Sequence, residues 1–451
     1  MRVAVVGAGI VGMTTAYELN ADGHAVTVFE RRGSVAAEGS FANAGVVAPG
    51  YVTPWAAPGM PAKVLAHLFR RHAPVRLRGG LDMQTAAWVW HWWRACRVRT
   101  YRANRLRMQR LAQFSRERLH RITRELKLDY ERSEGYLVLL RTAQESTAAE
   151  PGLETLAALN IRFDLLDAAQ CRAVEPNLSP DAALHQGIYL PDDEVGNCRE
   201  FATLLRAQAQ RLGVRFRFHT QVQRLVPGAT PQLVRMYAPP KPSATGAEAI
   251  ESASNRDAPD TQPMAAQPVV ERFDAIVVCA ATGSAALLAP HGLRLPIQPV
   301  YGCSITAPLR RHDGHFDQGP RSALMDERYK VAISRLGARV RVAGGAELGG
   351  SLETQHASSF DTLYKVLNDW FPGSVHERQA QRWKGARPML PDGPPVIGRS
   401  GIDGVWLNLG HGSSGWALAC GSARVVADAV AGRASVIDTE GLGIERLRAR
   451  P

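Results

Sequence analysis

The chain has 451 residues, of which 45% are hydrophobic and 21% charged, with a formal net charge of +12. This composition excludes a disordered or fibrous chain and predicts a globular protein of about two domains. The six cysteines are scattered without C-x-x-C pairs, so neither a metal site nor a disulfide framework is expected. No apolar run reaches the ~20 residues that cross a bilayer, and no signal peptide opens the chain, so we expect reduced thiols and at most peripheral membrane contact.

The first predicted elements are a strand, a helix and a second strand within "VAVVGAGIVGMTTAYELNADGHAVTVFER", residues 3–31. Residues 3–6 are typical of a short buried strand, and helical spacing of apolar residues starts at Ile10. Gly23 ends this helix, and residues 25–30 predict the second strand.

Three glycines separate the first strand from the helix in the pattern G-x-G-x-x-G. Gly7 would allow the tight turn, Gly9 the approach of a pyrophosphate, and Gly12 the close packing of the helix on the sheet. Glu30 ends the second strand, where an acid accepts hydrogen bonds from an adenosine ribose. Arg31 is adjacent, so this stretch leaves NADP open. The segment predicts a dinucleotide site.

Small residues dominate the next stretch, "RRGSVAAEGSFANAGVVAPGY". A nicotinamide dehydrogenase would continue into further strand–helix units, whereas this stretch predicts a long irregular loop over residues 39–50. Small side chains let the backbone approach a flat ligand closely.

A cluster of tryptophans, "AAWVWHWWRAC", precedes a stretch rich in arginine from Arg94 to Arg124. Such a stretch suits anionic lipid or nucleic acid, and tryptophan favours membrane interfaces. A solvated helical face with tryptophans in the core or lining a pocket is an equally good interpretation.

Strands and helices alternate through the rest of the chain. We expect a helix over 198–212, strands over 214–220 and 222–226, and a buried strand within "FDAIVVCAATG". Residues 238–268 are rich in Pro, Ala and Ser and predict a disordered loop. The alternation indicates an α/β sheet.

The C-terminal segment "LNLGHGSSGWALACGSARVVADAV" repeats the opening order of strand, glycine-rich turn and helix, with the helix over about 414–430. A second helix N-terminus can stabilise the negative charge of a reduced flavin. Two such turns suit FAD, which has both a pyrophosphate and an isoalloxazine to hold.

Five motifs together resemble the FAD-dependent D-amino acid dehydrogenases, within the D-amino acid oxidase and glycine oxidase superfamily. They are "GAGIVGMTTAYEL", "FANAGVVAPGY…PWAAPG", "LPDDEVGNC", "WKGARPMLPDGPPVIGR" and "LNLGHGSSGWALACGS". The sequence departs from the family pattern at Leu390, at Ser413–Ser414, in "AATGS" and in the 238–268 insertion.

The resemblance implies oxidative deamination of D-amino acids, D-alanine prominently, to 2-oxo acids and ammonia, by hydride transfer to flavin N5. It implies electron transfer to a respiratory quinone, at the cytoplasmic side of the inner membrane or in the cytoplasm, and no nucleic-acid partner. It also implies a Rossmann-like FAD-binding domain of the GR2 type, interleaved with a mixed-sheet α+β substrate domain.

We expect the FAD-binding domain to comprise residues 1–60, 195–290 and 385–451, and the substrate domain to comprise 61–194 and 291–384. The residues expected to bind FAD are Val3, Val5, Val6, Gly7, Ala8, Gly9, Ile10, Val11, Gly12, Met13, Glu30, Arg31, Ser40, Asn43, Ala44, Gly45, Val222, Ala281, Gly283, Gly410, His411, Gly412 and Ser413.

Three residues are candidates for the chemistry. Hydride transfer from a neutral amine needs no side-chain base, so orientation of the substrate is the main requirement. Arg387, in "KGARPM", matches the arginine that anchors the substrate carboxylate in the superfamily; a structural arginine is the alternative. Tyr329 would assist the carboxylate or cover the pocket, or simply lie on a strand of the substrate domain. His411 would lie near the flavin or the amine, or contribute only its backbone N–H.

Two further functions remain open at this stage. One is a flavin oxidase of the glycine or sarcosine type that uses oxygen, because sequence spacing does not report oxygen access to a flavin. The other is a flavin-dependent domain that modifies RNA, which would account for the basic stretch, although no RNA-binding module accompanies it.

Overall fold

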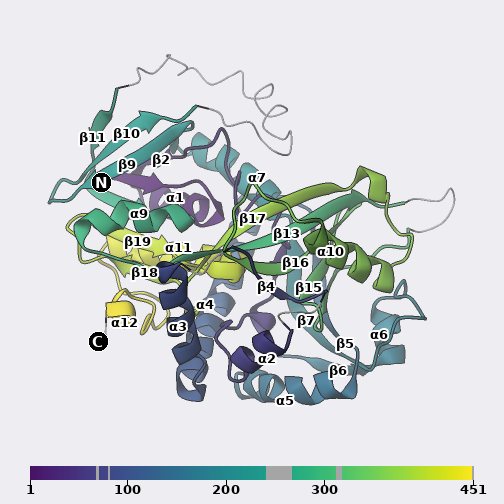
Figure 1. The fold of residues 1–451 in the computed structure, drawn as a ribbon. Helices are drawn as coiled ribbons and strands as arrows, with labels where there is room; N and C mark the ends of the chain where they lie inside the picture. Colours follow the sequence, from purple (N-terminus) through teal and green to yellow (C-terminus); the bar gives the residue numbers. More distant parts are fainter. Residues whose placement is uncertain (68–70, 80–81, 240–266, 311–316, 449–451) are drawn as a thin grey trace.

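The computed structural model describes residues 1–67, 71–79, 82–239, 267–310 and 317–448. It contains two large sheets that lie side by side, with helices around them (Figure 1). Most of the predicted 238–268 loop is outside the described residues.

The first sheet has six strands in the order β18-β19-β12-β1-β2-β8. Their bounds are Val396–Arg399, Val405–Leu409, Ala275–Val278, Arg2–Val6, Ala25–Phe29 and Arg215–Arg217. β1 pairs in parallel with both β12 and β2, which confirms the Rossmann-like expectation.

Both faces of β1 are buried, as its apolar residues predict. Val3 and Val5 pack on one face against the helices α1 (Ile10–Ala21), α4 (Val98–Glu125), α7 (Cys198–Arg211) and α11 (Gly415–Val430). Ala4 and Val6 face a three-stranded sheet of β9 (Thr220–Val226), β10 (Gln232–Tyr237) and β11 (Val269–Arg272), together with α9 (Ser284–Leu288).

The second sheet is mixed and has the order β17-β13-β16-β15-β14-β5-β7-β3, with β4 and β6 paired at its sides. The bounds are Gln381–Met389, Gln298–Pro308, Arg339–Leu348, Val331–Leu336, Ala323–Asp326, Arg132–Leu140, Gln186–Gly196 and Val46–Val47, with β4 at Val75–Leu77 and β6 at Asp164–Asp167. The helix α10 (Ala357–Trp370) covers one face through Phe360 and Trp370. The remaining longer helices are α2 (Met60–His67), α3 (Met83–Ala95), α5 (Ala143–Ala158) and α6 (Ala168–Val174).

The expected elements differ from the observed ones mainly at turns. The strand expected over 214–220 was wrong in extent: His219 adopts φ +51°, so β8 ends at Arg217 and Thr220 opens β9. The expected domain boundary at 385 falls inside β17, and α4, placed in the substrate domain, packs against α11 beside the first sheet. The division into two domains therefore stays a prediction.

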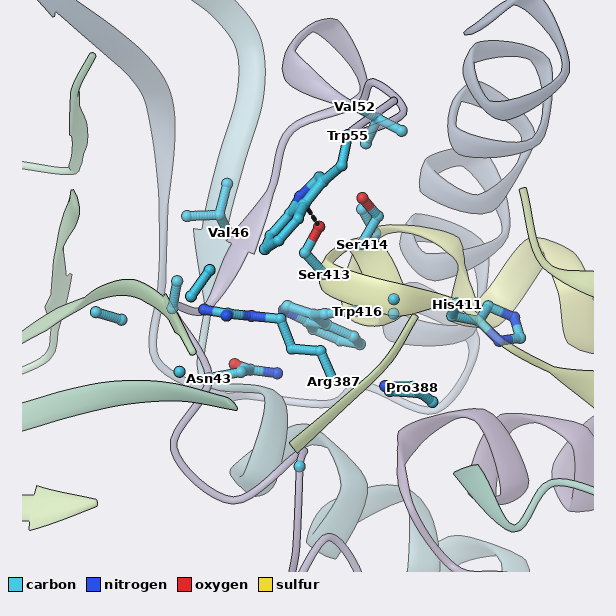
Figure 2. A pocket seen from close by; sticks show the side chains of 18 of the residues that line it. Asn43, Val46, Val52, Trp55, Arg387, Pro388, His411, Ser413, Ser414 and Trp416 are labelled. Carbon is cyan, nitrogen blue, oxygen red and sulfur yellow. Dashed lines mark hydrogen bonds between the residues drawn. The ribbon is translucent and has the colours of Figure 1, made fainter. Parts of the chain in front are cut away.

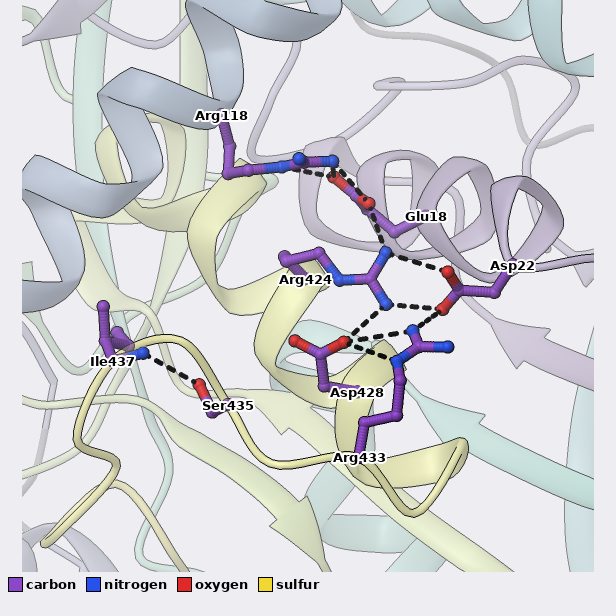
Figure 3. A network of polar contacts seen from close by, with 8 residues as sticks. All are labelled: Glu18, Asp22, Arg118, Arg424, Asp428, Arg433, Ser435 and Ile437. Carbon is purple, nitrogen blue, oxygen red and sulfur yellow. Dashed lines mark hydrogen bonds and ion pairs between the residues drawn. The ribbon is translucent and has the colours of Figure 1, made fainter.

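A buried carboxylate on α1 joins three helices (Figure 3). Glu18 is fully buried, and its two oxygens accept hydrogen bonds from Arg118 of α4 at 2.6 Å and from Arg424 of α11 at 2.8 Å. Arg424 also contacts Asp22 and Asp428. The network fixes α4 and α11 against α1, the helix that begins at the glycine-rich turn.

We expect Glu18→Gln to lower the free energy of unfolding by about 3 kcal/mol, because it leaves the largely buried guanidinium of Arg118 without a carboxylate and removes one of the three carboxylates around Arg424. Chemical denaturation monitored by circular dichroism measures this. Asp192→Asn is the matched control, since Asp192 also accepts from an arginine, Arg162, at 2.6 Å but is exposed. The control should change stability little; an equal loss in both variants would contradict the role of Glu18.

Candidate functional site

A large cavity lies where the two sheets meet, with a volume of about 2770 Å³. Its walls come from the glycine-rich turn after β1, the loop over residues 37–45, the end of β17 and the turn η5 (Gly412–Ser414) before α11. Figure 2 shows the part of the cavity around Arg387 and Trp55. Segments distant in the sequence therefore share one site.

The three glycines of the first turn serve different purposes. Gly7 has φ +104°, and a Cβ there would lie 2.6 Å from the carbonyl oxygen of Cys279. A Cβ on Gly12 would lie 1.9 Å from the carbonyl oxygen of Gly7, so helix and strand meet without a side chain between them. A Cβ on Gly9 would meet only Ser40 Oγ, at 3.6 Å. The protein itself leaves the space beside Gly9 open, as a bound pyrophosphate requires.

The acid after β2 is built into the same turn. Glu30 accepts hydrogen bonds from the backbone N–H of Ala8 at 2.7 Å and of Arg32 at 2.8 Å. Burial raises the pKa of Glu30, which these two N–H groups partly offset. The neighbouring Arg31 is held by both oxygens of Glu38, at 3.0 and 2.7 Å. Its guanidinium is thus already paired, which weighs against a 2′-phosphate partner.

Most of the residues expected to bind FAD do line the cavity. They are Val6, Gly7, Gly9, Ile10, Val11, Glu30, Arg31, Ser40, Asn43, Ala44, Gly45, Val222, Ala281, Gly283, Gly410, His411, Gly412 and Ser413. Five do not, namely Val3, Val5, Ala8, Gly12 and Met13, because their side chains or Cα atoms pack into the sheet and helix behind the turn. These five residues lie behind the cavity wall, and their contact with FAD stays a prediction.

Arg387 lies near the end of β17 and reaches the cavity wall. Its Nη1 donates to the carbonyl oxygen of Gly345 at 2.9 Å, and the guanidinium lies 5.9 Å from the ring centroid of Trp55. A Cβ on Gly302, on the neighbouring strand β13, would lie 2.3 Å from Nη2, so that glycine makes room for the guanidinium.

No carboxylate pairs with Arg387 in the described part of the chain, and burial lowers the pKa of its guanidinium. Arg387 is partly buried at the cavity wall, where a cation without an anion is costly to hold unless a ligand supplies the anion. Arg335, another arginine of the substrate sheet, differs: both of its terminal nitrogens bind Asp317 at 2.8 Å. Of these two arginines, Arg387 is therefore the one whose guanidinium can bind the carboxylate of a ligand.

Trp55 was not among the expected site residues, although it lies in the "PWAAPG" motif. Its indole N–H donates to Ser413 Oγ at 3.1 Å, which ties the loop after η1 (Pro49–Tyr51) to the turn before α11 (Figure 2). A tryptophan in a loop rich in proline and glycine, outside any helix or strand, is the signal that could have identified it.

Tyr329 lies in the turn between β14 and β15 and not on a strand. It lines the cavity, but its ring is flanked by the cations of Arg141 and Lys365, each 5.3 Å from the ring centroid, and by His72. Its observed contacts are with these side chains and not with Arg387, so its part in binding the carboxylate stays a prediction.

His411 is buried, and its Nε2 is 2.9 Å from Ser422 Oγ of α11. The imidazole points away from Arg387 in Figure 2. Burial lowers the pKa of His411 to about 3, so the ring is neutral at physiological pH. Two roles were expected for His411: a side chain near the flavin or the amine, or a backbone N–H alone. This geometry favours the backbone N–H. Leu390 is also buried, in the core behind Gly410, and does not line the cavity.

We expect Gly9→Val to abolish flavin binding while the fold persists. Gly9 has φ −65° and ψ 175°, which valine adopts readily, and the new side chain would fill the space open to the cofactor. The flavin absorbance of the purified protein and the unfolding midpoint of its flavin-free form test this. Stoichiometric flavin in the variant would contradict the placement of the pyrophosphate.

Comparisons with known proteins agree with this geometry. A model of the family described as FAD dependent oxidoreductase matches residues 2–429. A D-amino acid dehydrogenase of Cereibacter sphaeroides is 43% identical, over 100% of this chain and 98% of the relative. One of Rhizorhabdus wittichii is 40% identical, over 99% of this chain and 100% of the relative.

Two solved structures share the fold. Glycine oxidase from Geobacillus kaustophilus superposes with a TM-score of 0.71 at 19% identity and 98% coverage of both chains. Iminodiacetate oxidase from Chelativorans sp. BNC1 gives a TM-score of 0.69 at 19% identity, also with 98% coverage of both. With the family model matched over nearly the whole chain, this protein belongs to the FAD-dependent oxidoreductase family, and FAD is its cofactor.

Proposed function

We propose that the protein is a D-amino acid dehydrogenase, which converts D-amino acids, D-alanine first among them, to 2-oxo acids and ammonia. The relatives of that name, aligned over the whole chain, support the reaction class. The observation that supports the substrate class most directly is the unpaired guanidinium of Arg387 at the wall of the cofactor cavity.

Arg387 would hold the substrate carboxylate through two parallel hydrogen bonds, since a planar guanidinium matches the two carboxylate oxygens. Its bond to the Gly345 carbonyl leaves Nη2 and the remaining protons for a ligand. Trp55 lies over the same guanidinium and restricts the directions from which water and ligand reach it.

Bound FAD supplies the two-electron oxidation of the substrate α-carbon. The residues of this chain would orient the reactants: Gly7, Gly9 and the N-terminus of α1 would hold the pyrophosphate, and backbone N–H groups around Gly412 would stabilise negative charge on the reduced flavin. The neutral His411 adds no positive charge beside the substrate amine. Orientation by a fixed carboxylate anchor is then the largest contribution of the protein to the rate.

We further propose that electrons leave to a respiratory quinone, with the protein in peripheral contact with the cytoplasmic side of the inner membrane. No helix among the described residues is long and apolar enough to cross a bilayer.

The experiment that separates this dehydrogenase from an oxidase is anaerobic titration with D-alanine, followed by exposure to air.

In that titration we expect D-alanine, and not L-alanine, to bleach the flavin absorbance, with slow recovery in air and fast recovery with a soluble quinone. Rapid recovery with stoichiometric peroxide would show an oxidase instead. Bleaching by both enantiomers to the same extent would contradict the D-amino acid assignment.

We expect Arg387→Ala to lower kcat/KM for D-alanine by a factor of roughly a hundred to several thousand. This factor corresponds to a loss of about 3–5 kcal/mol of transition-state stabilisation. Flavin content and the unfolding midpoint should be unchanged, because no protein carboxylate loses its partner. Arg387→Lys should restore little, since an ammonium cannot reproduce the planar fork.

Arg382→Ala is the matched control, because Arg382 is on the same strand but exposed, packed over the rings of Phe360 and Tyr364 and outside the cavity. Steady-state kinetics with a soluble electron acceptor should find the control within a few-fold of wild type. Activity of Arg387→Ala within a few-fold of wild type would eliminate Arg387 as the anchor.

A further inference from the structure

The outward face of α3 carries large apolar side chains that are half exposed or more. Met83 is 91% exposed, Trp90 54% and Trp93 50%. Their spacing of seven and three residues places them on one face of the helix. The rings of Trp90 and Trp93 lie 5.1 Å apart, so they form a single exposed indole pair.

The opposite face of the same helix provides its anchorage. Trp88 is buried, and its indole N–H donates to the carbonyl oxygen of Met389 at 3.0 Å. Trp92 packs against the small cluster formed by Ala56, Ala95 and Cys96, which Met60 of α2 also covers. Because these contacts already hold α3, the exposed pair is not needed to fix the helix and is free to meet a partner.

The sequence around this helix is strongly positively charged. Between residues 39 and 116 the sequence contains twelve arginines and one lysine, while Asp82 is its only acid. Asp82 is the N-cap of α3, where it accepts from the backbone N–H of Thr85 at 2.6 Å. The segment therefore presents almost no negative charge of its own.

The arginines of this segment fall into two groups. Two arginines further along α4 form ion pairs with the C-terminal segment: Arg107 binds Glu440 and Arg110 binds Asp438, each at 2.6 Å. Arg94, Arg97 and Arg99, at the junction of α3 and α4, form no ion pair within the described ranges. We call Met83, Trp90, Trp93, Arg94, Arg97 and Arg99 the α3 patch.

We propose that the α3 patch is a lipid-binding surface that seats the protein on an anionic bilayer, with Trp90 and Trp93 at the interface and the three arginines at the headgroups. Indole rings favour the headgroup level of a bilayer, and unpaired guanidinium groups are attracted to anionic lipid. The inference deepens the proposed peripheral contact by naming its surface and lipid chemistry. α3 lies in the foreground of Figure 1.

Co-sedimentation of the FAD-loaded protein with vesicles tests the proposal. Vesicles of phosphatidylcholine and phosphatidylglycerol at 3:1 should bind the protein, and pure phosphatidylcholine vesicles should bind it about tenfold more weakly or less. Trp90→Ala/Trp93→Ala should weaken binding to the anionic vesicles at low and high salt. Arg94→Gln/Arg97→Gln/Arg99→Gln should weaken it mainly at low salt.

The matched control is Arg211→Gln/Arg215→Gln/Arg272→Gln, which removes the same charge from exposed positions outside the patch. It should bind as wild type does. Oxidation of D-alanine with a soluble acceptor should be unchanged in all three variants, so a failure of lipid binding is separable from a failure of the proposed reaction.

Three results would overturn the proposal. They are equal or absent binding of wild type to anionic and neutral vesicles, an equal loss in the control and patch variants, and tighter binding to a single-stranded RNA oligomer than to anionic vesicles. The last result would assign the patch to nucleic acid.

Discussion

The partly buried positive charge of Arg387 is the constraint around which the site is arranged. A guanidinium at a cavity wall, with one carbonyl as its hydrogen-bond acceptor and no carboxylate partner in the described chain, would be costly to hold without a rigid support. β17 supplies that support through its pairing with β13, where Gly302 leaves the space that the guanidinium occupies. The cost of the isolated charge is offset when a ligand carboxylate binds.

The first sheet brings the cofactor to the same place. Gly12 lets α1 touch the turn after β1, and Glu18, further along α1, holds α4 and α11 through Arg118 and Arg424. The start of α11 follows η5, where Ser413 accepts from Trp55. The helices α1 and α11, proposed to meet the pyrophosphate and the flavin, are thus joined to each other by ion pairs, and Trp55 connects α11 to the loop after η1.

Elements with strong local signals could be predicted from the sequence. Two segments show clear apolar periodicity: the strand, glycine-rich turn and helix at 2–21, and the C-terminal strand and helix at 405–430. Their turns contain glycines at positions where a Cβ would clash with neighbouring atoms. Turns were harder: the left-handed conformation of His219 separates β8 from β9, and although histidine is enriched in this conformation, most histidines do not adopt it, so the residue type alone does not mark the turn.

The site was predictable where a motif fixes the backbone, and less so where tertiary contacts decide. The cavity position of Arg387 agrees with its motif, whereas the inward orientation of His411 depends on Ser422, eleven residues away on α11. The contact of Trp55 with Ser413 joins residues 358 positions apart, which a single sequence does not reveal. Val3, Val5 and Met13 belong to the same motif but do not line the cavity, because a motif does not distinguish residues at the cavity wall from those behind it.

The most direct test of the central claim, that Arg387 receives the substrate carboxylate, is a spectral titration of the oxidised holoenzyme with propionate and with propanamide. The two ligands have similar shape and lack the amine, so their difference reports the carboxylate alone. The account predicts that propionate perturbs the flavin spectrum with a Kd about tenfold or more below that of propanamide, because a charge-assisted, bidentate hydrogen bond is stronger than a neutral one. Equal affinity for the two ligands would contradict it.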